Sequence, residues 1–197
     1  MWGDDMALPK KIDFYTYKDY INIDGDSRVE LIDGQFFAMS PAPSRIHQKI
    51  VTEGARIIGN FIAEKGLNCE VYVAPFDVRL IDEGGSEDTC KNVVQPDISV
   101  VCDKNKLDDK GCKGAPDFII EVVSPSNASI DYVKKLYLYE KFKVKEYWII
   151  NPDSKNVLVY TLNNEGQYGE PQKYRLDEQV QCNLFKELEF RLDEKNW

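Results

Sequence analysis

The chain lacks several features that particular classes of protein require. Its 197 residues contain one histidine, His47, so a zinc hydrolase or a nuclease that uses two histidines on one metal is excluded. No apolar run approaches the roughly 20 residues that span a bilayer. The N-terminus, Met1-Trp2-Gly3-Asp4-Asp5, is not basic and then apolar like a signal peptide. We therefore expect a soluble, cytoplasmic protein without a membrane partner.

The cysteines form no metal-binding or redox motif. Five of them stand at positions 69, 90, 102, 112 and 182 without a Cys-x-x-Cys unit. An odd number cannot all pair within one chain, so we expect reduced, mostly buried thiols and no structural zinc site.

The chain also lacks an excess of positive charge. Because its net charge is −9, the protein as a whole does not attract nucleic acid. Contact with DNA would need metal ions or a local basic patch. Two groups of lysines could form such a patch, although runs of this kind are usually solvated: Lys104, Lys106, Lys110 and Lys113, and Lys141, Lys143 and Lys145.

The apolar pattern predicts one α+β domain over residues 1–197, with a mixed sheet, β-hairpins and flanking helices, and with residues 1–11 as a loose tail. Asp33-Gly34 predicts a tight hairpin between residues 28–32 and 35–39. A helix is expected from about Arg45 to Lys65, closed by Gly66, and a second from Ser129 to about Phe142. Further strands are expected at 70–73, 76–80, 95–101, 118–123, 144–150, 157–162, 172–175 and 188–192.

Two of these strands carry an acid where an apolar residue is expected. Asp97 lies in Gln95-Pro96-Asp97-Ile98-Ser99-Val100-Val101, and Glu121 lies in Phe118-Ile119-Ile120-Glu121-Val122-Val123. An antiparallel hairpin that closes near Asp109 would pair residues whose numbers sum to about 218, which places Asp97 beside Glu121. Two adjacent carboxylates within apolar strands are costly without a cation or a proton between them. The pattern therefore predicts a metal site.

The second helix offers a third member of this site. At 100° per residue, Tyr132, Val133, Leu136 and Tyr139 form its apolar face, with Lys135 at the margin and Lys134 nearly opposite. Lys135 can therefore lean toward the sheet. The alternative is that Lys135 only forms a surface pair with Asp131, four residues earlier, and spacing leaves both open.

Several motifs in order resemble a known family. They are Val29-Glu30-Leu31-Ile32-Asp33-Gly34, Met39-Ser40-Pro41, His47-Gln48, Ala74 to Leu80, Val94 to Val101, Gly114 to Ser126, Asp131 with Lys135, and Glu146 to Ile150. The chain closely resembles the Uma-two family of restriction-endonuclease-like proteins, formerly a domain of unknown function, over about residues 28 to 162.

This resemblance implies a member of the PD-(D/E)xK nuclease superfamily with a restriction-endonuclease-like core. In that superfamily the two strand acids hold Mg²⁺, and a lysine assists the attacking water. Asp97 and Glu121 match the acids, and Mn²⁺ could replace Mg²⁺. The usual lysine position, two residues after the second acid, is Val123 here. Lys135 matches a lysine supplied instead by the following helix.

Other polar residues are weaker candidates. His47, in the first turn of the first helix, could approach the phosphate, although a role at the helix start is more common. Arg79 could line the substrate from a strand with one polar face. Glu53 could be an outer metal-site acid but is expected in solvent, and Glu30 is expected to be structural.

The leading hypothesis is a Mg²⁺-dependent endonuclease that hydrolyses phosphodiester bonds in DNA. The alternative is a catalytically silent relative that binds nucleic acid or a protein partner, which the net charge and Val123 favour. A hydrolase of small phosphate esters is a third hypothesis, and it would need a closed pocket. Cleavage of both DNA strands by one site per chain would favour a homodimer.

Overall fold

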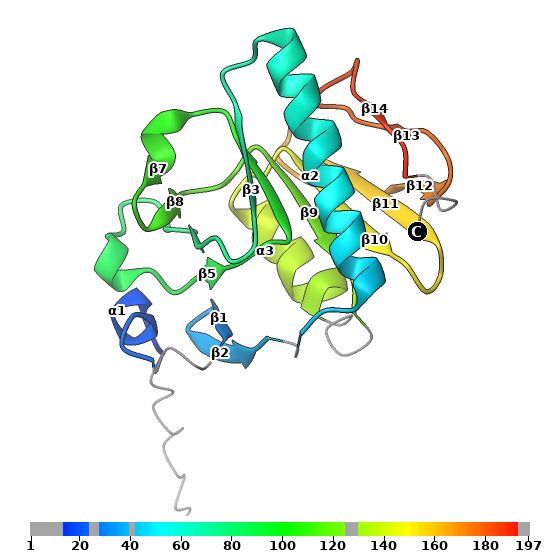
Figure 1. Ribbon diagram of the computed structural model, residues 1–197. Helices are drawn as coiled ribbons and strands as arrows, with labels where there is room; N and C mark the ends of the chain where they lie inside the picture. Colours follow the sequence, from blue (N-terminus) through cyan, green and yellow to red (C-terminus); the bar gives the residue numbers. More distant parts are fainter. Residues whose placement is uncertain (1–13, 24–27, 40–41, 125–129, 193–197) are drawn as a thin grey trace, which may run out of the picture.

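The computed structural model describes residues 14–23, 28–39, 42–124 and 130–192. These residues contain two six-stranded sheets and a long helix (Figure 1). Both sheets are mixed, because each contains one parallel and four antiparallel strand pairs. The predicted α+β class is confirmed. The tail predicted for residues 1–11 and the helix start predicted at Ser129 lie outside the described residues.

The elements have the following bounds. The first sheet runs β12 (Gln172–Arg175), β11 (Asn156–Thr161), β10 (Glu146–Asn151), β9 (Phe118–Val122), β6 (Ile98–Val101) and β3 (Glu70–Val73). The second runs β2 (Gln35–Ala38), β1 (Val29–Ile32), β5 (Val93–Val94), β4 (Val78–Arg79), β8 (Gly111–Lys113) and β7 (Leu107–Asp108). A separate pair is β13 (Val180–Gln181) with β14 (Glu189–Phe190). The helices are α1 (Tyr17–Tyr20), α2 (Arg45–Lys65) and α3 (Leu136–Lys141), with the short turns η1 (Glu87–Thr89) and η2 (Lys104–Lys106) and the π-helix η3 (Ile130–Lys135).

The first hairpin and the long helix α2 lie where the sequence predicts them, as their turn and cap residues indicate. Asp33 and Gly34 join β1 to β2 with positive φ angles of 48° and 74°. Helix α2 begins after Ser44, whose hydroxyl accepts a hydrogen bond from the backbone N–H of His47. It ends at Gly66, which has a left-handed φ of 61°. No helix in the described part of the chain has the length and hydropathy to cross a membrane.

Alternate residues of β9 face two different layers. Phe118 and Ile120 pack in the core that α2 shares with this sheet, whereas Ile119 and Val123 pack in the core on the opposite face. That second core also contains residues of α3 and of the second sheet. Glu121 alternates with Ile120 and therefore faces the second layer.

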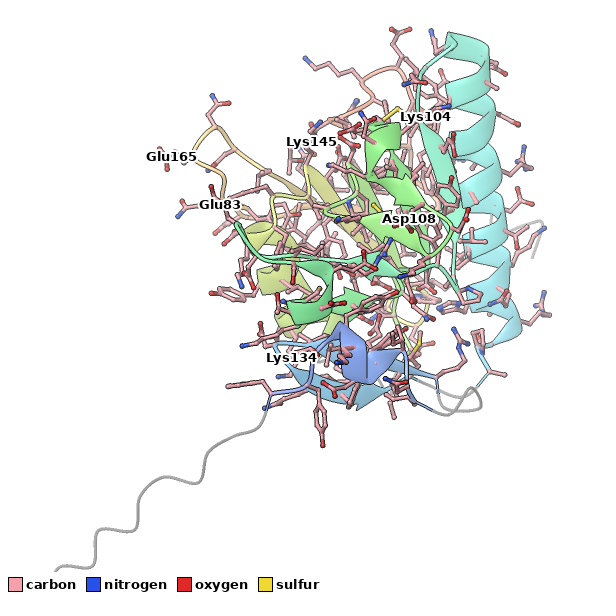
Figure 2. The ribbon with its side chains drawn as sticks, turned by 90° about the vertical axis from the view of Figure 1, so that its left-hand side faces the viewer. Glu83, Lys104, Asp108, Lys134, Lys145 and Glu165 are labelled. Carbon is pink, nitrogen blue, oxygen red and sulfur yellow. A yellow bond between two sulfur atoms is a disulfide. The ribbon has the colours of Figure 1, made fainter. Side chains whose placement is uncertain are left out.

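The predicted register of β6 and β9 is confirmed, but the predicted connection is wrong. Ile98 pairs with Ile120 and Val100 with Phe118, so the numbers of facing residues sum to 218 (98 and 120). The connecting segment does not close a simple hairpin. It forms η2, β7 and β8, and these strands join the second sheet, where Figure 2 shows Asp108 of β7. Gly111 is required there, because a Cβ would lie 2.2 Å from the Asp77 carbonyl oxygen.

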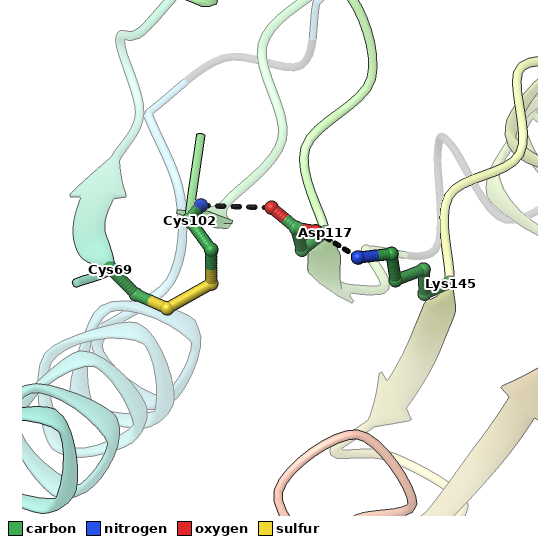
Figure 3. The surroundings of a disulfide bond; sticks show 4 residues. All are labelled: Cys69, Cys102, Asp117 and Lys145. Carbon is green, nitrogen blue, oxygen red and sulfur yellow. Dashed lines mark hydrogen bonds and ion pairs between the residues drawn. A yellow bond between two sulfur atoms is a disulfide. The ribbon is translucent and has the colours of Figure 1, made fainter. Parts of the chain in front are cut away.

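The prediction of reduced cysteines is wrong for one pair, since Cys69 and Cys102 form a disulfide (Figure 3). β3 pairs with β6 so that Glu70 lies opposite Val101, and the cysteines are the next facing residues. This strand pairing brings together two residues separated by 33 positions. The other three cysteines are free and buried.

Asp117 supports the same end of the sheet. Its carboxylate accepts the backbone N–H of Cys102 at 2.8 Å and lies 2.6 Å from the ammonium nitrogen of Lys145 (Figure 3). These interactions hold the pKa of Asp117 below its ordinary value, although burial opposes them. The end of the sheet opposite the cleft-lining acids is thus fixed by a covalent and an ionic link.

Reduction of the disulfide should lower the stability of the protein. Closing a loop with a sequence separation of 33 restricts the unfolded chain and contributes about 3–4 kcal/mol. Urea unfolding with and without dithiothreitol measures this difference. A Cys69→Ser/Cys102→Ser variant should be insensitive to the reductant, and an unchanged midpoint for the reduced wild type would contradict the prediction.

Candidate active site

A cleft of about 450 Å³ lies where the two sheets, the start of α2 and η3 meet. β1 contributes Glu30, and the first turn of α2 contributes His47. The remaining charged residues of its lining are Arg28, Asp97, Glu121, Asp131, Lys135 and Asp153. The cleft therefore brings Asp97, Glu121, Lys135 and His47 together, as the sequence predicted.

Asp97 and Glu121 lie close together because β6 and β9 hold them in the predicted register. Glu121 Oε2 lies 3.4 Å from the backbone nitrogen of Asp97, and Asp97 Oδ2 accepts the N–H of Val122 at 2.7 Å. The Glu121 side chain is 5% exposed, whereas the Asp97 side chain is 18% exposed. Asp97 is thus the acid that is more accessible from the cleft.

The π-helix η3 turns Lys135 into the cleft. Lys135 and Asp131 are buried, and Lys134 is exposed. The direction predicted for both lysines is confirmed. Val133, predicted on the apolar face, is instead 65% exposed. The wider winding of a π-helix changes the angle between successive side chains, so the α-helical wheel is wrong here.

Lys135 forms a buried ionic cluster and not a surface pair. Its Nζ lies 2.9 Å from Glu121 Oε1, 2.9 Å from Glu30 Oε1 and 3.6 Å from Asp131 Oδ1. Glu30, expected to be structural, therefore belongs to the site. The signal was present in Val29-Glu30-Leu31-Ile32, which carries an acid within an apolar strand as the two other site strands do.

Tyr139 and His47 complete the contacts to the two strand acids. The Tyr139 hydroxyl donates to Glu121 Oε1 at 2.9 Å, and this tyrosine is fully buried. His47 Nε2 lies 3.2 Å from Asp97 Oδ2. Burial alone would lower the pKa of His47, but Asp97 and the Val122 carbonyl raise it above its ordinary value. His47 thus favours its charged form beside Asp97.

The cleft contains more buried carboxylates than the single charge of Lys135 can neutralise. Burial raises the pKa of Glu121 well above its ordinary value, and burial raises that of Asp131 to about 6. Burial alone would lower the pKa of Lys135, but Glu121, Glu30 and Asp131 together raise it well above the ordinary value. An additional cation or proton would relieve the excess negative charge.

The residues present fit a hard cation with few protein ligands. In the described ranges, no group of three or more His, Cys, Asp or Glu side chains is arranged to hold a metal by itself. Asp97 and Glu121, with a backbone carbonyl such as that of Val122 and several waters, match the oxygen coordination that Mg²⁺ or Mn²⁺ prefers.

Arg79 lies away from the cleft, contrary to the prediction. Its side chain is fully buried and pairs with Glu87 at 2.8 Å and with Asp108 at 2.6 Å. Two carboxylates and the ring of Tyr17, 5.6 Å from the guanidinium carbon, therefore hold this arginine inside the second layer. Its charge compensates structural acids.

Glu53 also lies outside the cleft lining. It pairs with Lys49 at 3.1 Å and with Arg56 at 2.8 Å on α2. These are neighbours along the helix, so the structure does not place Glu53 as an outer metal-site acid.

Most lysines of the two predicted basic groups contact acids or carbonyls. On the face of the molecule that Figure 2 shows, acidic and basic side chains such as Glu83, Lys104 and Lys145 are intermixed. Four of them form the ion pairs Lys104–Glu70, Lys110–Glu87, Lys141–Asp82 and Lys145–Asp117, while Lys106 and Lys143 donate to the carbonyls of Ala115 and Gly166. These lysines do not form an uncompensated basic patch.

Comparisons with known proteins identify a family and relatives of similar sequence or fold. The model of the Uma2 family, described as "Putative restriction endonuclease", matches residues 14–193. A crystal structure described as a putative nuclease from Anabaena variabilis has a similar fold, with a TM-score of 0.68 and 21% identity, over 92% of this chain and 96% of that one. An uncharacterized protein of Synechocystis sp., slr1290, is 25% identical over 140 residues, which are 71% of this chain and 68% of that protein.

Replacing Lys135 by methionine should destabilise the protein by about 3–5 kcal/mol, because buried carboxylates lose their counter-charge. Lys134→Met, one residue earlier, is the matched control. It removes only an exposed contact 5.0 Å from the Phe37 ring and should cost less than about 1 kcal/mol. Urea unfolding of both variants checks the difference, and equal effects would show that the cluster contributes little.

Asp131→Asn should change how stability depends on pH. The folded protein keeps the Asp131 proton up to pH about 6, whereas the unfolded chain releases it near 3.8. The stability that this proton contributes is therefore complete below pH about 4 and lost as the pH rises to about 6. In EDTA, the variant should gain stability relative to wild type over this range. Parallel curves of unfolding free energy against pH would contradict the raised pKa.

Proposed function

The chain belongs to the Uma2 family of putative restriction endonucleases, and from this premise we propose that it is a Mg²⁺- or Mn²⁺-dependent endonuclease acting on DNA phosphodiester bonds. One observation supports the proposal most strongly. Asp97, Glu121 and Lys135 come from separate elements and meet in one cleft, with Lys135 Nζ 2.9 Å from Glu121.

Asp97 and Glu121 would hold the metal ion in this proposal. When bound, the ion would polarise the scissile phosphate and lower the pKa of a bound water. The two acids also repel the phosphate backbone when no cation is present. Since the net charge is −9 and most lysines of the two groups are partnered, DNA binding should depend on the metal.

Lys135 would supply a positive charge next to the reacting phosphate. Its ammonium group donates to Glu121 and lies beside the acids, so it can orient the attacking water or stabilise negative charge on the phosphate. The buried Val123 side chain stands at the usual lysine position of the strand. The helix-borne lysine thus supplies the charge that the strand lacks.

His47, which lies beside Asp97, would contact the substrate. It lies in the first turn of α2, and its raised pKa favours an imidazolium that can face a phosphate oxygen. Cleavage of both DNA strands would need two such clefts, so we also propose that a homodimer forms when both strands are cut.

A catalytically silent protein that binds nucleic acid or a protein partner is the second candidate. The observation in its favour is that Glu121 Oε1 already contacts both Lys135 and Tyr139. A metal ion must compete with these donors for that oxygen.

A plasmid-nicking assay with Mg²⁺ and with Mn²⁺ separates the two candidates. Wild type should nick supercoiled DNA, and Asp97→Asn, Glu121→Gln and Lys135→Gln should each slow nicking by at least about 100-fold. Glu53→Gln is the control, because its carboxylate lies outside the cleft lining. Inert wild type in both metals, or an Asp97→Asn variant as fast as wild type, would overturn the nuclease proposal.

A further inference from the structure

Glu30 connects two parts of the cleft that are distant in the sequence. Its Oε1 accepts the backbone N–H of Gln95 at 2.8 Å and lies 2.9 Å from Lys135 Nζ. Gln95 stands two residues before Asp97 in the sequence. One oxygen atom therefore contacts both the lysine and the segment that leads into the first strand acid.

The Gln95 segment is itself fixed from the opposite side. The Gln95 side-chain amide donates to Asp77 Oδ1 at 2.8 Å and to the Tyr20 hydroxyl at 3.1 Å. Tyr20 in turn donates to Asp77 at 2.9 Å. Because these bonds link α1 and the second sheet to Gln95, Glu30 is anchored to a backbone segment with several restraints.

Lys135 lies midway between two carboxylates with different surroundings. Its Nζ is 2.9 Å from Oε1 of Glu30 and 2.9 Å from Oε1 of Glu121. Glu121 also accepts from Tyr139 and faces Asp97, so it is the acid that a cation would engage. Glu30 would remain as a partner of the lysine when Glu121 turns to the cation.

We propose that Glu30 is a positioning residue, which holds the Lys135 ammonium group beside the Asp97 segment while Glu121 serves the metal ion. Both Glu30 and Lys135 are only 4% exposed, so neither gains much from solvent and each needs a charged partner. This inference rests on the proposed function, but the ionic pair that carries it can be tested without catalysis.

The kinetic test compares Glu30→Gln with Glu53→Gln. Glutamine keeps an oxygen for the Gln95 N–H but loses the charge that holds Lys135. Glu30→Gln should lower kcat for plasmid nicking by about 10- to 100-fold while KM changes by less than about threefold. Glu53→Gln should match wild type, and an unchanged kcat for Glu30→Gln would overturn the proposal.

Calcium titration calorimetry distinguishes positioning from direct ligation. If Glu30 acts through Lys135, its glutamine variant should bind Ca²⁺ within about tenfold of wild type, whereas Asp97→Asn should lose measurable binding. If Glu30→Gln loses Ca²⁺ binding to the same extent as Asp97→Asn, Glu30 is a metal ligand and the proposed role is wrong.

Thermal unfolding of the double variant tests the pair in the absence of activity. Glu30→Gln should lower Tm in the wild-type background, because Lys135 loses a partner. The same change should raise Tm or restore folding in Lys135→Met, because it removes an unpaired buried carboxylate. Equal shifts in both backgrounds would overturn the pairing. Wild type that does not nick DNA would overturn the proposed nuclease function, and these melting curves would still decide the pairing.

Discussion

The cleft depends on the ion pairs between the Lys135 ammonium group and the buried carboxylates around it. Glu30 from β1, Glu121 from β9 and Asp131 from η3 lie within 3.6 Å of its nitrogen. Acids buried this deeply are costly unless a positive charge lies between them. The lysine therefore joins the second sheet, the first sheet and the π-helix at one point, and the same charge contacts Glu121, one of the two acids proposed to hold a metal. The Lys135 ammonium group therefore stabilises the fold and, in the proposed function, also takes part in the reaction.

The parts of the fold set by local chemistry could be predicted from the sequence. The ends of α2 follow from a serine hydroxyl at Ser44 and a left-handed glycine at Gly66. The β6 and β9 register agrees with the register expected from a turn near Asp109, although the connecting segment joins the other sheet and does not close a simple hairpin. This register is what places Asp97 opposite Glu121, so the central pair of the site was accessible from spacing alone.

The remaining features depend on contacts between distant segments. The Cys69 and Cys102 pairing follows from the β3 and β6 register, which neither strand reveals by itself. A π-helix differs from an α-helix by its winding, and side-chain pattern at 100° per residue does not distinguish them. Glu30 and Arg79 are both polar residues in short apolar strands, but Glu30 faces the cleft, whereas Arg79 is buried and pairs with Glu87 and Asp108 away from it. Their neighbours in space, and not their sequence context, decide these roles.

Anomalous diffraction from a crystal soaked in Mn²⁺ would show whether the strand acids hold a metal, because it locates the ion without a need for substrate or turnover. We expect one Mn²⁺ in the cleft with oxygen ligands from Asp97 and Glu121, and Lys135 retained against Glu30. Manganese bound only outside the cleft, or bound there without Asp97, would contradict a metal-dependent site built on these residues.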